Sequence, residues 1–478
     1  MTNKLIDEIR NALDSRLVTS DELFDESVSK AYKYQDKYNC FVTILDKKEE
    51  KKGNTVLQGI PYALKDNIST KGILTTASSN ILKDYIPLYD ATVYKKLMEA
   101  GAVLMGKTVL DELAMGGTGT TGHTGVVRNP WNEKRMIGGS SAGSAAAVAL
   151  GIVPFALGSD TGDSIRKPAA YGGVVGYKPT YGRISRYGLF AFASSLDHMG
   201  LFARSVKDVS YVMDIIKGHD DKDMTSLPDE DISYVDNLDN DVKGKKLFYI
   251  KEAVEIDNDS EELKLILDNF YKAIDECKKL GMEVVEVSFR KDLLEAIYPS
   301  YMCISCAEAT SNNSNLTGIP FGYRVEGNNV NEIMMKTRTE GFSELIKRRF
   351  VLGSYVLQKE NQEKLFLNAC RIRRLIVDNM NELFKEYDAL IMPSAGDIAP
   401  LFGNVSDKLS DEYLILGNHL AIGNFGGFPS ISIPSGFVND MPVSVNITGR
   451  AKEDYLVLNM ASKLEEALGF KGQVKVDE

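Results

Sequence analysis

The chain has 478 residues, 44% of them hydrophobic and 26% charged, which is typical of a globular protein large enough to bury an extended core. Its net charge of −11 argues against a basic nucleic-acid-binding face on this chain, although not against a partner that supplies one. The five cysteines are scattered and only Cys303 and Cys306 form a C-x-x-C pair, which is neither a zinc pattern nor a disulfide framework and indicates a reduced, cytoplasmic protein.

Helices and short apolar strands are expected to alternate along the chain. Apolar residues recur at helical spacing from Leu5 to Leu13, and residues 19–22 (TSDE) predict the cap of a second helix, so 1–55 is interpreted as an N-terminal helical segment. The elements expected after it are a strand at 59–67, a helix at 90–100, a strand at 102–105, a helix at 141–150, a strand at 154–157, strands at 246–250 and 282–287 around a helix at 260–280, mostly long charged helix over 340–386, and strands at 389–393 and 430–434. This alternation predicts an α/β layered fold with a largely buried sheet.

Residues 218–245 interrupt this pattern. The stretch reads GHDDKDMTSLPDEDISYVDNLDNDVKGK and is rich in Asp, Asn and Lys. Such a composition favours an acidic surface loop or insertion, and we expect no catalytic residue in it.

Residues 137–183 are unusually poor in charge and rich in Gly, Ser and Ala. The first half of the stretch contains no ionisable side chain. Charged residues then return together among glycines and hydroxyl groups, at Asp160, Asp163, Arg166 and Lys167. Glycine permits tight turns and a close approach to a ligand, and successive backbone N–H groups in such a loop can hold an anion. With Ser140, Ser141 and Ser164 inside these turns, the stretch predicts a nucleophile beside an oxyanion site.

Residues 101–108 (GAVLMGKT) fit the P-loop pattern in full, but their context argues against nucleotide binding. A P-loop follows a strand and is polar and open. Here a charged helix is expected before Gly101, and the loop positions are apolar residues that favour burial.

A second match, GSSAG at 139–143, fits the G-x-S-x-G nucleophile elbow around Ser141. That elbow directly follows a buried strand, which the preceding NPWNEKRMI is not, and the hydrolase order needs an Asp and then a His downstream. His198 and His419 are the remaining candidates, so a Ser141 hydrolase stays an alternative.

Without a clear histidine base, a neutral lysine is the other group that could deprotonate a serine. The ordinary pKa of lysine is about 10.4, and burial lowers it by up to about 3–5 units. Lys65 is the best candidate, because it ends the apolar run GIPYAL and its aliphatic stem can be buried there.

Three motifs, GIPYALKDNI, GGSSAGSAAAVA and GSDTGDSIRKPAA, resemble the amidase signature family in sequence, order and spacing, and the likeness covers nearly the whole chain. The resemblance implies one domain over 1–478, with a central, mostly parallel or mixed β-sheet covered by helices on both faces. It also implies a Ser–cis-Ser–Lys triad, with Ser164 as the nucleophile, Ser140 as the bridging serine and Lys65 as the base. No metal or cofactor is expected on this chain.

The resemblance assigns further roles around the triad. The backbone N–H groups expected to hold the oxyanion are those of Thr161, Gly162, Asp163 and Ser164. Asp160 and Arg166 are expected to brace this loop. Tyr301 and Arg349 are expected to contact the substrate, and an arginine suits a bidentate contact with a carboxylate.

Within the family, the blocks KPTYGRISRYGL, FASSLD, CAEATSN, EGFSELIKRRFVLG and NFGGFPSISIP resemble the glutaminase subunits of Glu-tRNA(Gln) amidotransferases. This likeness implies hydrolysis of glutamine to glutamate and ammonia, and transfer of the ammonia to a partner that amidates Glu-tRNA(Gln). The expected partners are the B and C subunits of a heterotrimer, and no contact with a membrane is expected. ATP, Mg²⁺ and most of the tRNA contacts are expected on the B subunit. The alternative is a stand-alone amidase acting on small amides.

Two places depart from the family pattern. The loop usually reads GGSIR followed by Gln, whereas this chain has Asp163 and Lys167 there. Because they are four residues apart, we expect them to pair and to turn the Asp163 carboxylate away from the oxyanion site. The related subunits also carry an Asp that holds the substrate ammonium group where this chain has Gly417, and the neighbouring Asn418 is the expected replacement.

Overall fold

The structure is a computed structural model that describes residues 1–49, 51–255, 260–403 and 415–475. Its main sheet is built from β1 Phe41–Ile44, β2 Pro61–Lys65, β3 Val103–Thr108, β6 Phe155–Asp160, β7 Val175–Lys178, β8 His198–Ala203, β9 Lys246–Ile250, β10 Glu283–Val287, β11 Ala389–Pro393, β12 Ser430–Val438 and β13 Met441–Gly449. A small separate sheet pairs β4 Arg128–Asn129 with β5 Asn132–Met136.

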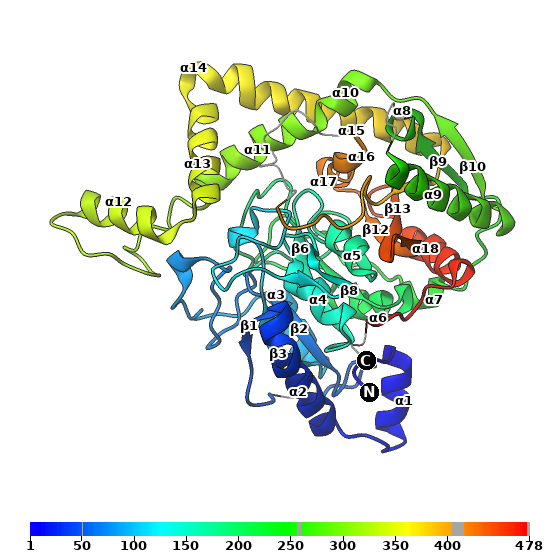
Figure 1. Ribbon diagram of the computed structural model, residues 1–478, viewed down its shortest axis with the longest axis horizontal. Coiled ribbons are helices and arrows are strands. Elements are labelled where there is room, and N and C mark those ends of the chain that lie inside the picture. The colour runs from blue at the N-terminus through cyan, green and yellow to red at the C-terminus, as the bar shows by residue number, and fades with distance from the viewer. Residues whose placement is uncertain (50, 256–259, 404–414, 476–478) are drawn as a thin grey trace.

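The main sheet has the strand order β1-β3-β2-β6-β8-β7-β12-β13-β11-β9-β10 and runs through the middle of the molecule (Figure 1). Parallel pairs join β2 to β3 and β6, and β9 to β10 and β11. The remaining neighbours are antiparallel. The predicted α/β fold with a mixed sheet is therefore confirmed, although parallel pairs are not in the majority.

Helices cover the sheet and extend beyond one end of it (Figure 1). They are α1 Ile6–Asp14, α2 Ser20–Tyr38, α3 Thr92–Glu99, α4 Ala142–Ala149, α5 Arg166–Gly172, α6 Val206–Ile216, α7 Tyr234–Asn237, α8 Lys251–Val254, α9 Glu261–Lys279, α10 Lys291–Glu295, α11 Ile297–Asn312, α12 Val330–Gly341, α13 Glu344–Leu357, α14 Lys359–Gln362, α15 Asn368–Glu386, α16 Ile415–Asn418, α17 Ala421–Phe425 and α18 Asp454–Leu468. Among the described helices, none is both long and apolar enough to span a membrane.

Around β2 the two faces of the sheet pack into two different hydrophobic cores, as the alternation along that strand shows. Tyr62 and Leu64 lie in a core shared with α3, α6 and α18, whereas Ala63 lies in the core that contains α2, α4 and α5. Helix α4 consists of small residues and approaches its neighbours closely: a Cβ at Gly143 would lie 2.3 Å from the backbone oxygen of Cys40. The charge-poor stretch is thus a buried packing helix between two strands.

Most predicted elements are confirmed, including the Thr19 cap, whose hydroxyl accepts a hydrogen bond from the Glu22 backbone. Three expectations need correction. The N-terminal segment is not purely helical, because 41–44 forms the edge strand β1. The stretch 340–386 is divided among several helices, α13 to α15, and a π-helical turn at 363–367. The acidic stretch 218–245 is not entirely surface, since its short helix α7 buries Tyr234 completely.

Candidate active site

The sheet topology brings Lys65 to the nucleophile loop. Strands β2 and β6 are parallel neighbours, so their carboxyl ends lie at the same edge of the sheet. Lys65 is the last residue of β2, and the loop 161–165 follows Asp160 at the end of β6. The carboxyl edge of parallel strands is where α/β proteins commonly place their ligands.

The Lys65 side chain is completely buried and surrounded by hydroxyl groups. Its Nζ lies 2.8 Å from Oγ of Ser140, of Ser141 and of Ser159, and 3.3 Å from the Ser159 backbone oxygen. No carboxylate of the described residues lies in ion-pair range of this amine. Burial lowers the pKa of Lys65 to about 7, although the more distant Asp111, Asp160 and Asp197 oppose that shift. An amine with such a pKa is about half unprotonated at neutral pH, so it can act as a base there.

The geometry joins Lys65 to Ser140 directly and brings Ser164 alongside. The Gly139–Ser140 peptide bond is cis. The backbone oxygen of Ser164 accepts a hydrogen bond from the Ser141 N–H at 3.2 Å, and the Ser164 side chain is almost buried. Within the described residues, the Ser164 hydroxyl makes no hydrogen bond to Ser140. Catalytic hydrogen bonds are often long in a site without substrate and shorten when substrate binds.

The loop from Thr161 to Ser164 offers its backbone N–H groups to a ligand. None of these four N–H groups donates a hydrogen bond to any acceptor in the part of the chain that the structure describes. Buried N–H groups without a partner are rare in proteins. The next residue, Ile165, already donates its N–H to Asp160 Oδ2 at 3.0 Å. The unpaired groups are therefore confined to the loop predicted to hold the oxyanion.

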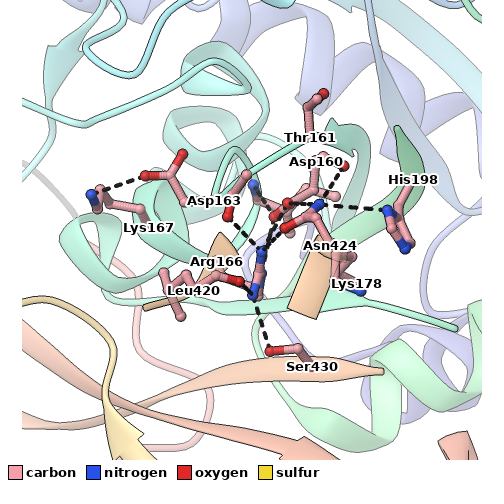
Figure 2. Close-up of polar contacts among 12 residues, drawn as sticks. Asp160, Thr161, Asp163, Arg166, Lys167, Lys178, His198, Leu420, Asn424 and Ser430 are labelled. Carbon is pink, nitrogen blue, oxygen red and sulfur yellow. Dashed lines mark hydrogen bonds and ion pairs between the residues drawn. The ribbon is translucent and has the colours of Figure 1, made fainter. Parts of the chain in front are cut away.

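A buried ion pair between Asp160 and Arg166 holds this loop in shape (Figure 2). The Arg166 guanidinium donates to both carboxylate oxygens, at 3.1 and 2.9 Å, and to the Gly162 backbone oxygen at 2.9 Å. Burial opposes ionisation of Asp160, but Arg166 outweighs it and holds the pKa of that carboxyl well below its ordinary value. Arg166 also donates to the Leu420 backbone oxygen at 2.7 Å, which ties the loop to the segment before α17.

Several contributing residues were missed by the sequence predictions. Asn424 donates to the Asp160 carboxylate at 2.9 Å and accepts from Arg166 at 2.7 Å, and it lies inside the quoted NFGGFP block. Ser159 contacts Lys65 and directly precedes Asp160. Asp197, within FASSLD, accepts from the Thr161 hydroxyl at 2.7 Å. Asp111 had no sequence signal: its carboxylate accepts backbone N–H groups from each residue of 118–121.

A pocket beside the loop collects the three predicted substrate-binding residues. Tyr301 on α11, Arg349 on α13 and Asn418 at the end of α16 line it together with Gly162 and Asp163. The Tyr301 ring packs against the loop so closely that a Cβ at Gly162 would lie 3.0 Å from it. Arg349 has no carboxylate within ion-pair range among the described residues, and its buried Nε has no hydrogen-bond partner there. The pocket therefore contains a cation without an ion-pair partner among the described residues, next to the loop predicted to hold the oxyanion.

The two departures from the family pattern meet at this pocket. Asp163 Oδ2 lies 2.9 Å from Lys167 Nζ, so the predicted pairing is present and the carboxylate is turned toward Lys167 (Figure 2). Lys167 Nζ also donates to the Gly417 backbone oxygen at 2.9 Å. The two unusual stretches, 250 residues apart in sequence, are thus joined by one lysine.

The alternative sites are poorly placed. Ser141 is completely buried, and its hydroxyl donates to the Ser159 backbone oxygen at 3.0 Å, so no substrate reaches it. Neither His198 nor His419 contacts it; each is buried with Nδ1 at a backbone oxygen. The lysine of the P-loop match, Lys107, lies in the buried strand β3 and pairs with Asp66 at 3.4 Å. Among the described residues, no cluster of His, Cys, Asp or Glu is arranged to hold a metal ion.

The pKa of Lys65 predicts a pH dependence of activity. The base must be unprotonated, so kcat/KM for amide hydrolysis should rise with pH, with a midpoint near the Lys65 pKa of about 7, and level off above it. The measurement is kcat/KM from about pH 5.5 to about pH 9. The pKa of Asp197, which burial raises to about 6, lies in the same range, and Asp197→Asn separates the two groups: because the Asp197 charge raises the pKa of Lys65, its removal should move the midpoint to lower pH but not abolish it. A profile that is flat across this range would contradict Lys65 as the base.

Comparison with known proteins agrees with this geometry. The amidase family model matches residues 22–458. The A subunit of the glutamyl-tRNA(Gln) amidotransferase of Halothermothrix orenii is 41% identical, over 98% of this chain and 97% of that protein, and its counterpart in Sulfurisphaera tokodaii is 39% identical over 98% of both. The crystal structure of the A subunit from Thermotoga maritima has a TM-score of 0.82 at 35% identity, covering 98% of this chain and 95% of that one. The chain therefore belongs to the amidase family.

Proposed function

We propose that this chain is the glutamine-hydrolysing A subunit of a glutamyl-tRNA(Gln) amidotransferase. The observation that carries the proposal is the contact of a buried, low-pKa Lys65 with Ser140, beside a loop of unpaired N–H groups. The similarity to such A subunits over nearly the whole length supports glutamine as the amide substrate. Arg349, for which the described residues offer no ion-pair partner, supports a substrate that carries a carboxylate.

The chemistry follows from the positions of three side chains. Lys65 accepts the proton of the Ser140 hydroxyl, Ser140 takes the proton of Ser164, and the Ser164 oxygen attacks the amide carbon of glutamine. The negative charge that develops on the carbonyl oxygen is stabilised by the N–H groups of 161–164, at about 3–4 kcal/mol per donor. The proton returns through Ser140 to the leaving nitrogen, so ammonia departs and a glutamyl ester remains on Ser164. Water then attacks the ester by the same relay and releases glutamate.

The pocket side chains would orient the substrate. Arg349 would bind the α-carboxylate of glutamine, and the Tyr301 ring would hold the side-chain amide against the oxyanion loop. Asn418, which lines the same pocket, would contribute a polar contact. Orientation of this kind is worth several kcal/mol of the barrier, because it replaces a bimolecular encounter by a fixed geometry.

The remaining parts of the reaction belong to partners. The B subunit would bind ATP, Mg²⁺ and most of the tRNA, and the C subunit would complete a cytoplasmic heterotrimer. The acidic character of this chain, with a net charge of −11, fits a division in which the tRNA is bound elsewhere.

Reconstitution tests the proposal. We expect this chain, co-expressed with candidate B and C subunits, to support Gln-tRNA(Gln) formation with either glutamine or ammonium chloride as the nitrogen donor. The chain alone should hydrolyse glutamine weakly. The measurements are the yield of Gln-tRNA(Gln) and the release of glutamate. A chain that hydrolyses simple amides such as propionamide without partners, faster than the complex hydrolyses glutamine, would instead be a stand-alone amidase.

A further inference from the structure

The substrate pocket contains two opposite charges, and only one of them is explained by the function proposed above. Arg349 supplies a cation for a carboxylate, and Asp163, an acidic residue, also lines this pocket. An uncharged amide side chain has no need of that second charge. A free amino acid does, because it carries an ammonium group close to its carboxylate.

Only one of the two oxygens of the Asp163 carboxylate has a partner among the described residues. Its Oδ2 pairs with Lys167 Nζ at 2.9 Å, whereas its Oδ1 has no hydrogen-bond partner among the described residues. The Asp163 side chain is 24% exposed, and Lys167 only 7%. Lys167 is in turn fixed by the Gly417 backbone oxygen at 2.9 Å. One oxygen of this carboxylate therefore remains without a partner among the described residues, on a side chain that lines the pocket.

Lys167 is the one cation in ion-pair range of this carboxylate among the described residues. Burial lowers the pKa of Lys167, but Asp163 and Asp397 together raise it above its ordinary value, so the lysine stays charged. Of the carboxylates in the described part of the chain, only Asp163 lies within ion-pair range of Lys167, and Arg166 is engaged by Asp160. The second oxygen of Asp163 can therefore pair with a further cationic group.

We propose that Asp163 binds the α-ammonium group of the amino-acid substrate through Oδ1, and that Lys167 is the positioning residue that aims it. The inference rests on glutamine hydrolysis as the function of this site. It places the anionic contact on the nucleophile loop, at Asp163. Lys167 connects this residue to Gly417, the position at which the related subunits are expected to carry an Asp. In this chain the carboxylate is thus supplied by Asp163 on one segment, and the neighbouring segment has a glycine at 417 in its place.

The space at Gly417 allows a carboxylate to be placed there instead. A Cβ built on Gly417 meets no described atom within 4 Å, and no positive φ is found there that would disfavour a side chain. An aspartate can therefore be introduced at 417, the residue whose backbone oxygen Lys167 contacts. If Asp163 had only a structural role, this aspartate would not restore the activity lost in Asp163→Asn.

The test compares glutamine with glutaramate, which has the same amide and carboxylate but a hydrogen in place of the α-ammonium group. The enzyme is the full chain co-expressed with the B and C subunits, and the readout is the ratio of kcat/KM for the two amides. In Asp163→Asn this ratio should fall roughly 10- to 100-fold, mainly through a higher KM for glutamine, because one charge-assisted hydrogen bond is lost. The double variant Asp163→Asn, Gly417→Asp should recover most of the ratio.

The outcomes separate this inference from the proposed function. An unchanged ratio in Asp163→Asn, or an equal loss for both amides, would overturn the inference while glutamine hydrolysis itself stands. Calorimetric titration of glutamine and glutaramate into the Ser164→Ala complex gives the corresponding ratio of the two binding constants. Asp163→Asn should reduce that ratio too. A wild-type complex that neither binds nor hydrolyses glutamine would overturn the proposed function and the inference with it.

Discussion

Replacing Ser164 with alanine is expected to abolish glutamine-dependent formation of Gln-tRNA(Gln) by the assembled enzyme, while ammonia-dependent formation continues. Without the Ser164 oxygen no acyl-enzyme forms, and removal of a serine nucleophile costs roughly 10⁴- to 10⁶-fold in kcat. Ammonia supplied from solution bypasses this step, because it needs only the partner that activates the tRNA. The two yields, measured on the same preparation, check the prediction.

The control for this experiment is Ser29→Ala, at an exposed position of helix α2. It removes the same hydroxyl far from the site and should leave both yields unchanged. Ser141→Ala provides the critical comparison. Because the Ser141 hydroxyl supports Lys65 rather than facing a substrate, its loss should reduce activity less than the loss of Ser164. Full activity in Ser164→Ala together with none in Ser141→Ala would instead favour a Ser141 hydrolase.

Replacing Lys65 with arginine should be nearly as damaging, although arginine is also a long, basic side chain. A guanidinium keeps its proton at any pH at which the protein is folded, so it cannot accept one from Ser140. The loss of a general base lowers kcat by about 10²- to 10⁴-fold. Lys65→Met should lose a similar factor, since it fills the buried space without a base. Glutamate release by the two variants is the measurement.

Folding must be checked in parallel, because Lys65 is completely buried. Thermal unfolding should show that Lys65→Met is folded, as methionine fills the buried space without placing a charge there. Lys385→Met, at a 70% exposed position of helix α15, is the matched control and should have full activity. A folded Lys65→Arg variant that retains most of its glutaminase activity would exclude Lys65 as the base.

Local sequence patterns were sufficient for the elements that carry the site. The apolar run before Lys65, the small residues of α4 and the strand before Asp160 were each predicted close to their observed positions. The edge strand β1 was missed, because FVTI is short and follows a long helix. The breaks in 340–386 were missed because charged residues favour helix throughout that stretch, and the turns between its helices lack strong breaking residues.

The sequence by itself determined the family, the alternation of elements and the residues proposed as the triad, because these depend on residue type and spacing along the chain. Only the tertiary structure decided the electrostatics of the site. The low pKa of Lys65 arises from burial between β6 and α4, and the loop is braced by Asn424, 264 residues from Asp160. The pairing of Asp163 with Lys167 could be predicted from their spacing, but the contact of Lys167 with Gly417 is visible only in the folded chain. Burial and long-range hydrogen bonds exist only after distant segments meet, so no local pattern encodes them.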